Sequence, residues 1–150
     1  TILNGRNSRL DTLQAVILNE RLKKLKSDNF KRINFAAKYN AKLKHLPIKL
    51  PPFEKNLSNV FHLYVIRVNS KLRDKLLNYL KENKIIAGIH YRTPNFLHPA
   101  FKTKINYKKL KNSKRISDEI ISLPIYPELK ISEQNKVIST IKNFFYEQTY

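Results

Sequence analysis

The chain opens with a cationic polar turn that leads directly into an apolar helical stripe. Ser8 is suited to cap a helix, and Asp11 three residues later completes an S-x-x-D variant of the capping box. Apolar side chains then recur at helical spacing, at Leu10, Leu13, Ile17, Leu22 and Leu25. The pattern predicts helix over residues 8–46, interrupted near Ser27 and Asp28, with one face that must pack against another surface.

Two interpretations fit the polar residues at the start of this helix. Asn7 and Arg9 lie at the positive end of the helix dipole. Free backbone N–H groups, an amide and a guanidinium together suit an anion such as phosphate. Alternatively, the segment is an ordinary capped helix with a solvated Arg9.

The middle and end of the chain predict a small α/β layer. Residues 60–68 have the β-branched and aromatic composition of a strand, and a helix capped by Ser70 follows and ends at Asn83-Lys84. Residues 85–91 are predicted as a second strand, so the unit is strand, helix, strand. We expect an irregular connection over 93–111, a short helix over 113–122 and a terminal amphipathic helix that opens at Ser132.

The composition excludes some kinds of site but does not identify the class of protein. The formal net charge is +19 and cysteine is absent, so disulfides and thiolate metal sites are excluded. A chain this basic could bind nucleic acid or the anionic face of a membrane. Its lysines are spread along the sequence and not gathered in one block, which weakens that interpretation. We therefore favour a general compositional bias as the source of the charge. The apolar runs are too short to span a membrane and no signal peptide opens the chain, so a cytoplasmic location is expected.

Four ordered stretches carry a family resemblance. They are GRNSRLDTLQAVIL (residues 5–18), FHLYVIRV (61–68), GIHY (88–91) with the prolines that follow it, and SDEIISLPIYPEL (117–129). In this order they resemble the C-terminal part of the DegT/DnrJ-type nucleotide-sugar aminotransferases, which depend on pyridoxal 5′-phosphate (PLP). The resemblance covers nearly the whole chain.

The resemblance implies a fold and an activity. The fold would be α/β (α+β): the small C-terminal domain of an aspartate-aminotransferase-like, fold type I enzyme, with long N-terminal helices and a small sheet under covering helices. Residues 1–150 would form this single domain, and the domain with the PLP-binding lysine would lie outside the chain. The complete enzyme would be a homodimer that transfers an amino group, typically from glutamate, to a nucleotide-linked keto-sugar for polysaccharide or lipopolysaccharide synthesis. The fragment alone would be inactive.

The same resemblance implies roles for particular residues. Asn7 and Arg9 match the segment that contacts the PLP phosphate of the neighbouring subunit, or else they only brace the dimer. His90 and Tyr91 match a pair at the sugar-binding cleft, although such a pair can also be merely packed. Arg92 replaces the usual proline and is a candidate for contacting a diphosphate.

Other features of the sequence leave room for alternatives. The family's second histidine is replaced by Phe96, and His98 is displaced from that position. The four histidines lack the spacing of metal ligands, so no metal is expected. A basic nucleic-acid-binding α/β module and an inactive relic of the aminotransferase family remain the alternative hypotheses.

Overall fold

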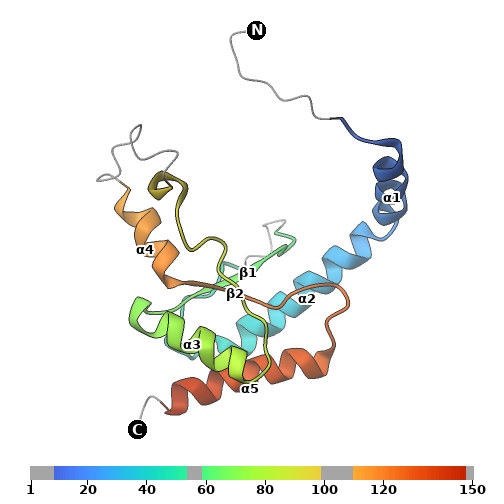
Figure 1. Cartoon of the computed structure of the whole chain (residues 1–150). Helices are drawn as coiled ribbons and strands as arrows, with labels where there is room; N and C mark the ends of the chain where they lie inside the picture. Colours follow the sequence, from blue (N-terminus) through green and yellow to red (C-terminus); the bar gives the residue numbers. More distant parts are fainter. Residues whose placement is uncertain (1–8, 54–58, 99–109, 148–150) are drawn as a thin grey trace.

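A computed structural model describes residues 9–53, 59–98 and 110–147 of the chain. Two short strands lie at its centre, and helices α2, α3 and α5 gather on one side of them (Figure 1). The elements in chain order are α1 (Thr12–Leu22), α2 (Leu25–Leu43), β1 (Tyr64–Arg67), α3 (Ser70–Glu82), the 3-10 turn η1 (Asn95–Leu97), α4 (Lys111–Glu119), β2 (Ile120–Leu123) and α5 (Ile131–Glu147). The predicted mixture of long N-terminal helices, a small sheet and covering helices is confirmed.

The helical predictions differ from the structure mainly at helix starts. The N-cap of α1 is Asp11, whose side chain accepts a hydrogen bond from the Leu13 N–H at 3.0 Å. The break between the two N-terminal helices lies at Lys23 and Lys24, three to four residues before the predicted position at Ser27. Asn69, and not Ser70, caps α3 by accepting from the Lys71 N–H. Short polar side chains compete for the same cap position, so the pattern located these starts only to within a few residues.

Helix α3 ends where the sequence predicted, and the backbone geometry at Lys84 shows how it is terminated. Lys84 adopts a left-handed backbone conformation with φ of 61°. Its N–H donates to the Lys81 carbonyl and the next N–H, of Ile85, donates to the Leu80 carbonyl, both at 2.9 Å. This pair of hydrogen bonds is the Schellman termination of a helix, and it turns the chain back toward the strands.

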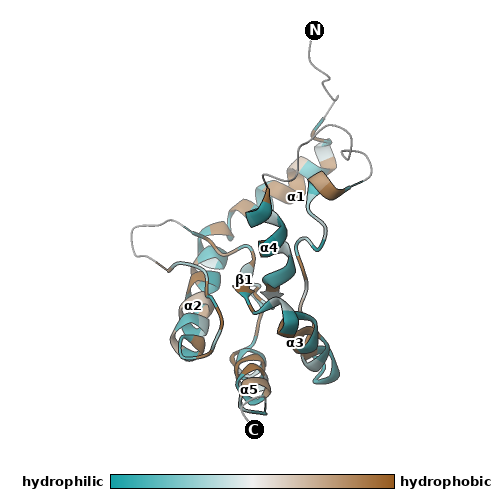
Figure 2. Cartoon of the chain, turned by 90° about the vertical axis from the view of Figure 1, so that its left-hand side faces the viewer, coloured by the Kyte–Doolittle hydropathy of each residue, from teal (hydrophilic) through white to brown (hydrophobic). Residues whose placement is uncertain are grey.

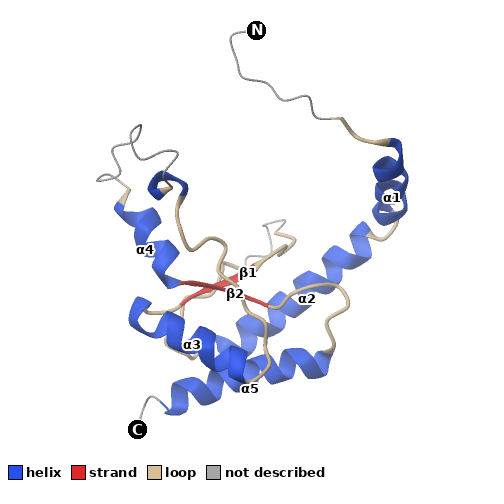
Figure 3. Ribbon diagram, viewed as in Figure 1, coloured by secondary structure: helices blue, strands red, loops and turns tan. Residues whose placement is uncertain are grey.

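The second strand of the sheet is not the one predicted from the sequence. β1 pairs antiparallel with β2, in the register Tyr64 to Leu123 through Arg67 to Ile120 (Figure 3). Residues 85–91 form no strand and contribute only a single bridge from Gly88 to Ser122. The helix expected over 113–122 is α4, which runs from Lys111 to Glu119, and β2 begins at the next residue, Ile120. Single bridges from Lys49 and Gly88 flank the two strands, so both of their outer edges are partly covered.

The hydrophobic core lies between the strands and helices α2, α3 and α5. Tyr64 and Ile66 of β1, Leu76 and Leu80 of α3 and Ile141 of α5 are fully buried within it. The predicted apolar stripes of α3 and α5 therefore face this core.

Two tyrosines, Tyr39 and Tyr64, also lie inside the core, with ring centroids 4.9 Å apart. The Tyr39 hydroxyl donates to the Pro124 carbonyl at 2.9 Å. The Tyr64 hydroxyl has no hydrogen-bond partner among the described residues.

Burial raises the pKa of Tyr64 well above its ordinary value. The unfolded chain therefore releases this proton near pH 10 while the folded chain retains it, so the stabilising contribution is present below pH 10 and is lost as the pH rises further. We predict that Tyr64→Phe flattens the alkaline fall in the free energy of unfolding, measured by urea denaturation between pH 8 and 11. The exposed Tyr146→Phe is the control; an equal effect of both substitutions would contradict the assignment.

Candidate functional site

The segment that follows α3 carries the predicted sugar-site residues along the edge of β2. The Gly88 N–H donates to the Ser122 carbonyl at 3.0 Å, and the Ser122 N–H donates to the Gly88 carbonyl at 2.7 Å. After this bridge the chain turns at His90 and Tyr91. The turn is thus attached to the sheet immediately before the two candidate residues.

His90 and Tyr91 differ in how firmly they are held. The His90 Nδ1 lies 2.9 Å from the Ser122 Oγ, although the residue as a whole is exposed. The Tyr91 ring meets the His90 ring edge-on at 5.8 Å and is itself 76% exposed. An exposed imidazole and an exposed phenol side by side can hydrogen-bond hydroxyl and carbonyl oxygens of a polar ligand.

Arg92 takes part in a small charged cluster with α3. Its Nη2 donates to the Asp74 Oδ1 at 3.2 Å, and the same oxygen lies 2.9 Å from the Nε of Arg73. Arg73 is buried and its Nη1 donates to the Ser117 carbonyl on α4, whereas the Arg92 side chain is 56% exposed. Arg92 therefore keeps part of its guanidinium open to a ligand while Asp74 holds it near the turn.

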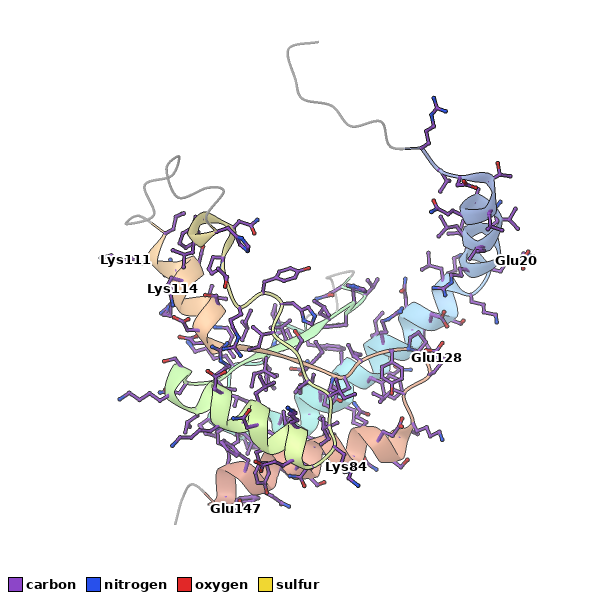
Figure 4. All side chains as sticks on the ribbon, viewed as in Figure 1. Glu20, Lys84, Lys111, Lys114, Glu128 and Glu147 are labelled. Atoms are coloured by element: carbon purple, nitrogen blue, oxygen red, sulfur yellow. The ribbon has the colours of Figure 1, made fainter. Side chains whose placement is uncertain are left out.

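The segment beyond Arg92 borders a cavity that the sequence did not predict. Phe96, at the position where the resemblance led us to look for a second histidine, is buried in η1, and His98 is exposed. Phe96 and Leu97 line a cavity of about 800 Å³ together with residues of α4, among them Lys111 and Lys114. Figure 4 labels these two lysines on α4. Lys114 is paired with Asp118, so part of this positive charge is already compensated.

The predicted phosphate-binding pair is only partly described. Asn7 lies outside the described residues. Arg9 is exposed just before α1, and the structure gives no contact between it and the turn at His90. The α1 helix itself stands away from the rest of the chain in Figure 1 and buries none of its residues.

Much of the apolar stripe predicted for α1 is open to solvent. Leu13 is 70% exposed and Ile17 is 50% exposed, and Figure 2 shows hydrophobic residues along this helix. Monomeric proteins rarely leave so continuous an apolar face uncovered. The face therefore has the character of a contact surface.

The sequence analysis did not identify Ser122, which contacts His90, or Asp74, which pairs with Arg92. For Ser122 a signal was available, because a lone serine stands within the apolar run IISLPI. Nothing in the local pattern pointed to Asp74.

Neither a membrane segment nor a metal cluster is found in the part of the chain that the structure describes. No described helix is long and apolar enough to cross a bilayer. The described residues contain no group of three or more histidine, cysteine or acidic side chains placed to hold a metal ion.

Comparison with known proteins identifies the family. Residues 1–142 match the sequence model of the DegT/DnrJ/EryC1/StrS aminotransferase family, and the chain belongs to that family. It is 35% identical over 145 residues to dTDP-3-amino-3,6-dideoxy-alpha-D-galactopyranose transaminase of Aneurinibacillus thermoaerophilus, covering 97% of this chain and 39% of the relative. It is 30% identical to UDP-2-acetamido-2-deoxy-3-oxo-D-glucuronate aminotransferase of Pseudomonas aeruginosa, covering 93% of this chain and 38% of the relative.

Solved structures agree with this assignment. DesV of S. venezuelae superposes with a TM-score of 0.87 at 33% identity, covering 95% of this chain and 38% of that one. NtdA of Bacillus subtilis, solved with bound cofactor PMP, gives a TM-score of 0.85 at 28% identity, with 97% and 35% covered. The fold is therefore that of part of a sugar aminotransferase, and the chain spans less than two fifths of the length of these relatives.

The two arginines that share Asp74 should contribute unequally to stability. We predict that Arg73→Ala lowers the free energy of unfolding by about 2–4 kcal/mol, since it removes a buried side chain and its bond to the Ser117 carbonyl. Arg92→Ala breaks only an exposed ion pair and should cost less than about 1 kcal/mol. Urea denaturation measures both; equal losses would contradict the burial difference.

Proposed function

We propose that this chain is the C-terminal portion of a PLP-dependent aminotransferase that acts on a nucleotide-linked keto-sugar. The family match over residues 1–142 is the observation that carries this proposal. Two of the relatives are named as transaminases of dTDP-linked amino sugars and another as an aminotransferase of a UDP-linked 3-oxo sugar. We take glutamate as the amino donor, because a relative 30% identical to the chain is named 3-oxo-glucose-6-phosphate:glutamate aminotransferase. The amino sugar formed would enter polysaccharide or lipopolysaccharide synthesis.

The reactive lysine of such an enzyme belongs, in this proposal, to a domain outside the chain. Bound PLP supplies an electron sink for moving the amino group, and a lysine carries the cofactor. An activated lysine is usually desolvated, yet among the described residues no lysine side chain is buried. The chain's contribution is thus to bind and orient.

Arg9 and Asn7 would bind the phosphate of PLP held by the neighbouring subunit. The Arg9 guanidinium is exposed next to the N-terminus of α1, where helix N–H groups also favour an anion. The exposed apolar face of α1 would be covered by the remainder of a homodimeric enzyme. Leu13, Ile17 and their neighbours would then be buried on assembly, which accounts for their exposure in the separate chain.

His90, Tyr91 and Arg92 would form one wall of the sugar site. The imidazole and the phenol can hydrogen-bond sugar oxygens. The exposed part of Arg92 suits the diphosphate, since a guanidinium binds phosphate oxygens in a bidentate manner. This wall needs the cofactor from the other domain to act.

The proposal that the reactive lysine lies outside the chain can be tested directly. We predict that the 150-residue chain incubated with PLP and then reduced with borohydride shows only scattered substoichiometric labelling of its lysines by mass spectrometry. The complete enzyme, treated identically, should be labelled at one lysine outside the chain. Stoichiometric labelling of a single lysine within residues 1–150 would refute this division of labour.

The proposed binding of the PLP phosphate by Asn7 and Arg9, called here the phosphate clamp, can be tested separately. In the complete enzyme, replacing both Asn7 and Arg9 by alanine should raise the dissociation constant for PLP roughly tenfold or more, since charge-assisted bonds to phosphate are lost. Equilibrium dialysis measures the cofactor retained. Arg21→Ala, on the same helix, is the matched control. Unchanged retention in the double variant would exclude the clamp.

A further inference from the structure

Ser122 lies where the sheet can control the orientation of His90. In β2 the neighbouring Ile121 and Leu123 pair with Ile66 and Tyr64, and all four side chains are buried in the core. Side chains alternate along a strand, so the Ser122 hydroxyl points to the opposite face. That hydroxyl, in a residue only 4% exposed, meets the His90 imidazole.

The backbone of Ser122 fixes the same segment a second time. Both of its peptide groups bond to Gly88, two residues before His90. Ser122 thus makes three hydrogen bonds to residues 88–90, two from the main chain and one from the side chain. Its backbone and its hydroxyl thus contact the two ends of the same three-residue segment.

Gly88 also lies close to the His90 imidazole. A Cβ atom placed on Gly88 would come within 2.9 Å of the His90 Cε1, closer than such atoms approach in proteins. The imidazole therefore lies directly against the glycine. With a side chain at position 88, the imidazole or the backbone beside it would have to shift.

We propose that Ser122 is a positioning residue that fixes the orientation and tautomer of His90 for sugar binding; this inference rests on the proposed function. In this proposal the Ser122 hydroxyl is the donor and Nδ1 the acceptor of the 2.9 Å contact, which leaves the proton of the neutral ring on Nε2. Nε2–H is then a fixed donor. Its partner is an acceptor oxygen, a carbonyl or hydroxyl of the keto-sugar.

The tautomer is directly measurable on the 150-residue chain. We expect nitrogen-15 spectra of the imidazoles, recorded at pH 8.5 where histidines are ordinarily neutral, to show His90 almost wholly in the Nε2–H form. Ser122→Ala should return His90 toward the tautomer mixture of the exposed His45, His62 and His98. Ser122→Thr keeps a hydroxyl and should preserve the wild-type signal.

Two further variants separate positioning from a general loss of structure. Ser139→Ala removes an exposed hydroxyl that bonds only to its own helix, and should leave the His90 signal unchanged. Gly88→Ala keeps Ser122 but pushes the ring aside, so it should reproduce the effect of Ser122→Ala. A His90 signal that is the same in Ser122→Ala as in the wild type, with the other histidines unaltered, would overturn the proposal.

Kinetics of the complete enzyme distinguish this inference from the proposed function. If His90 binds the sugar, Ser122→Ala should lower kcat/KM for the keto-sugar several-fold, and should have no further effect once His90 is already alanine. An altered tautomer with unchanged kinetics would contradict the sugar-binding role of His90 while leaving the Ser122 contact in place. An unaltered tautomer would instead refute the positioning role, whatever the kinetics.

Discussion

The antiparallel pairing of β1 with β2 is the interaction on which the rest of this structure depends. It joins segments more than fifty residues apart, and one face of the pair is buried by three helices. At one end, Arg67 donates twice to the Glu119 carboxylate, at 2.9 and 2.7 Å. At the other, Ser122 holds the turn that carries His90. The same few residues therefore close the core and build the candidate sugar site.

The helices were predictable because their information is local. Apolar side chains recurring along α3 and α5 indicated the buried faces, and Asn83-Lys84 indicated where α3 ends. Strand pairing was not predictable in this way, because which segments meet depends on contacts between distant parts of the chain. Residues 85–91 have the composition of a strand, yet β2 occupies the position beside β1 and leaves Gly88 a single bridge.

The candidate site shows a similar division. Its exposed residues, His90, Tyr91 and Arg92, were identified by resemblance to a family, since an exposed side chain carries little local signature of its role. The residues that hold them were missed. Ser122 lies within an apolar run, and Asp74 lies on the polar side of an amphipathic helix, so only the folded arrangement reveals their contacts. The exposed apolar face of α1 was foreseen as a packing surface, and the surface it packs against lies beyond this chain in our proposal.

The central claim is that the strand pair presents His90 to a sugar in a site completed by the rest of the enzyme. A crystal structure of the complete enzyme with its cofactor and a nucleotide-linked sugar tests this most directly. The account predicts the His90 Nε2 within about 3.2 Å of a sugar oxygen while Nδ1 remains on Ser122. A sugar bound elsewhere, with His90 Nε2 facing only solvent, would contradict it.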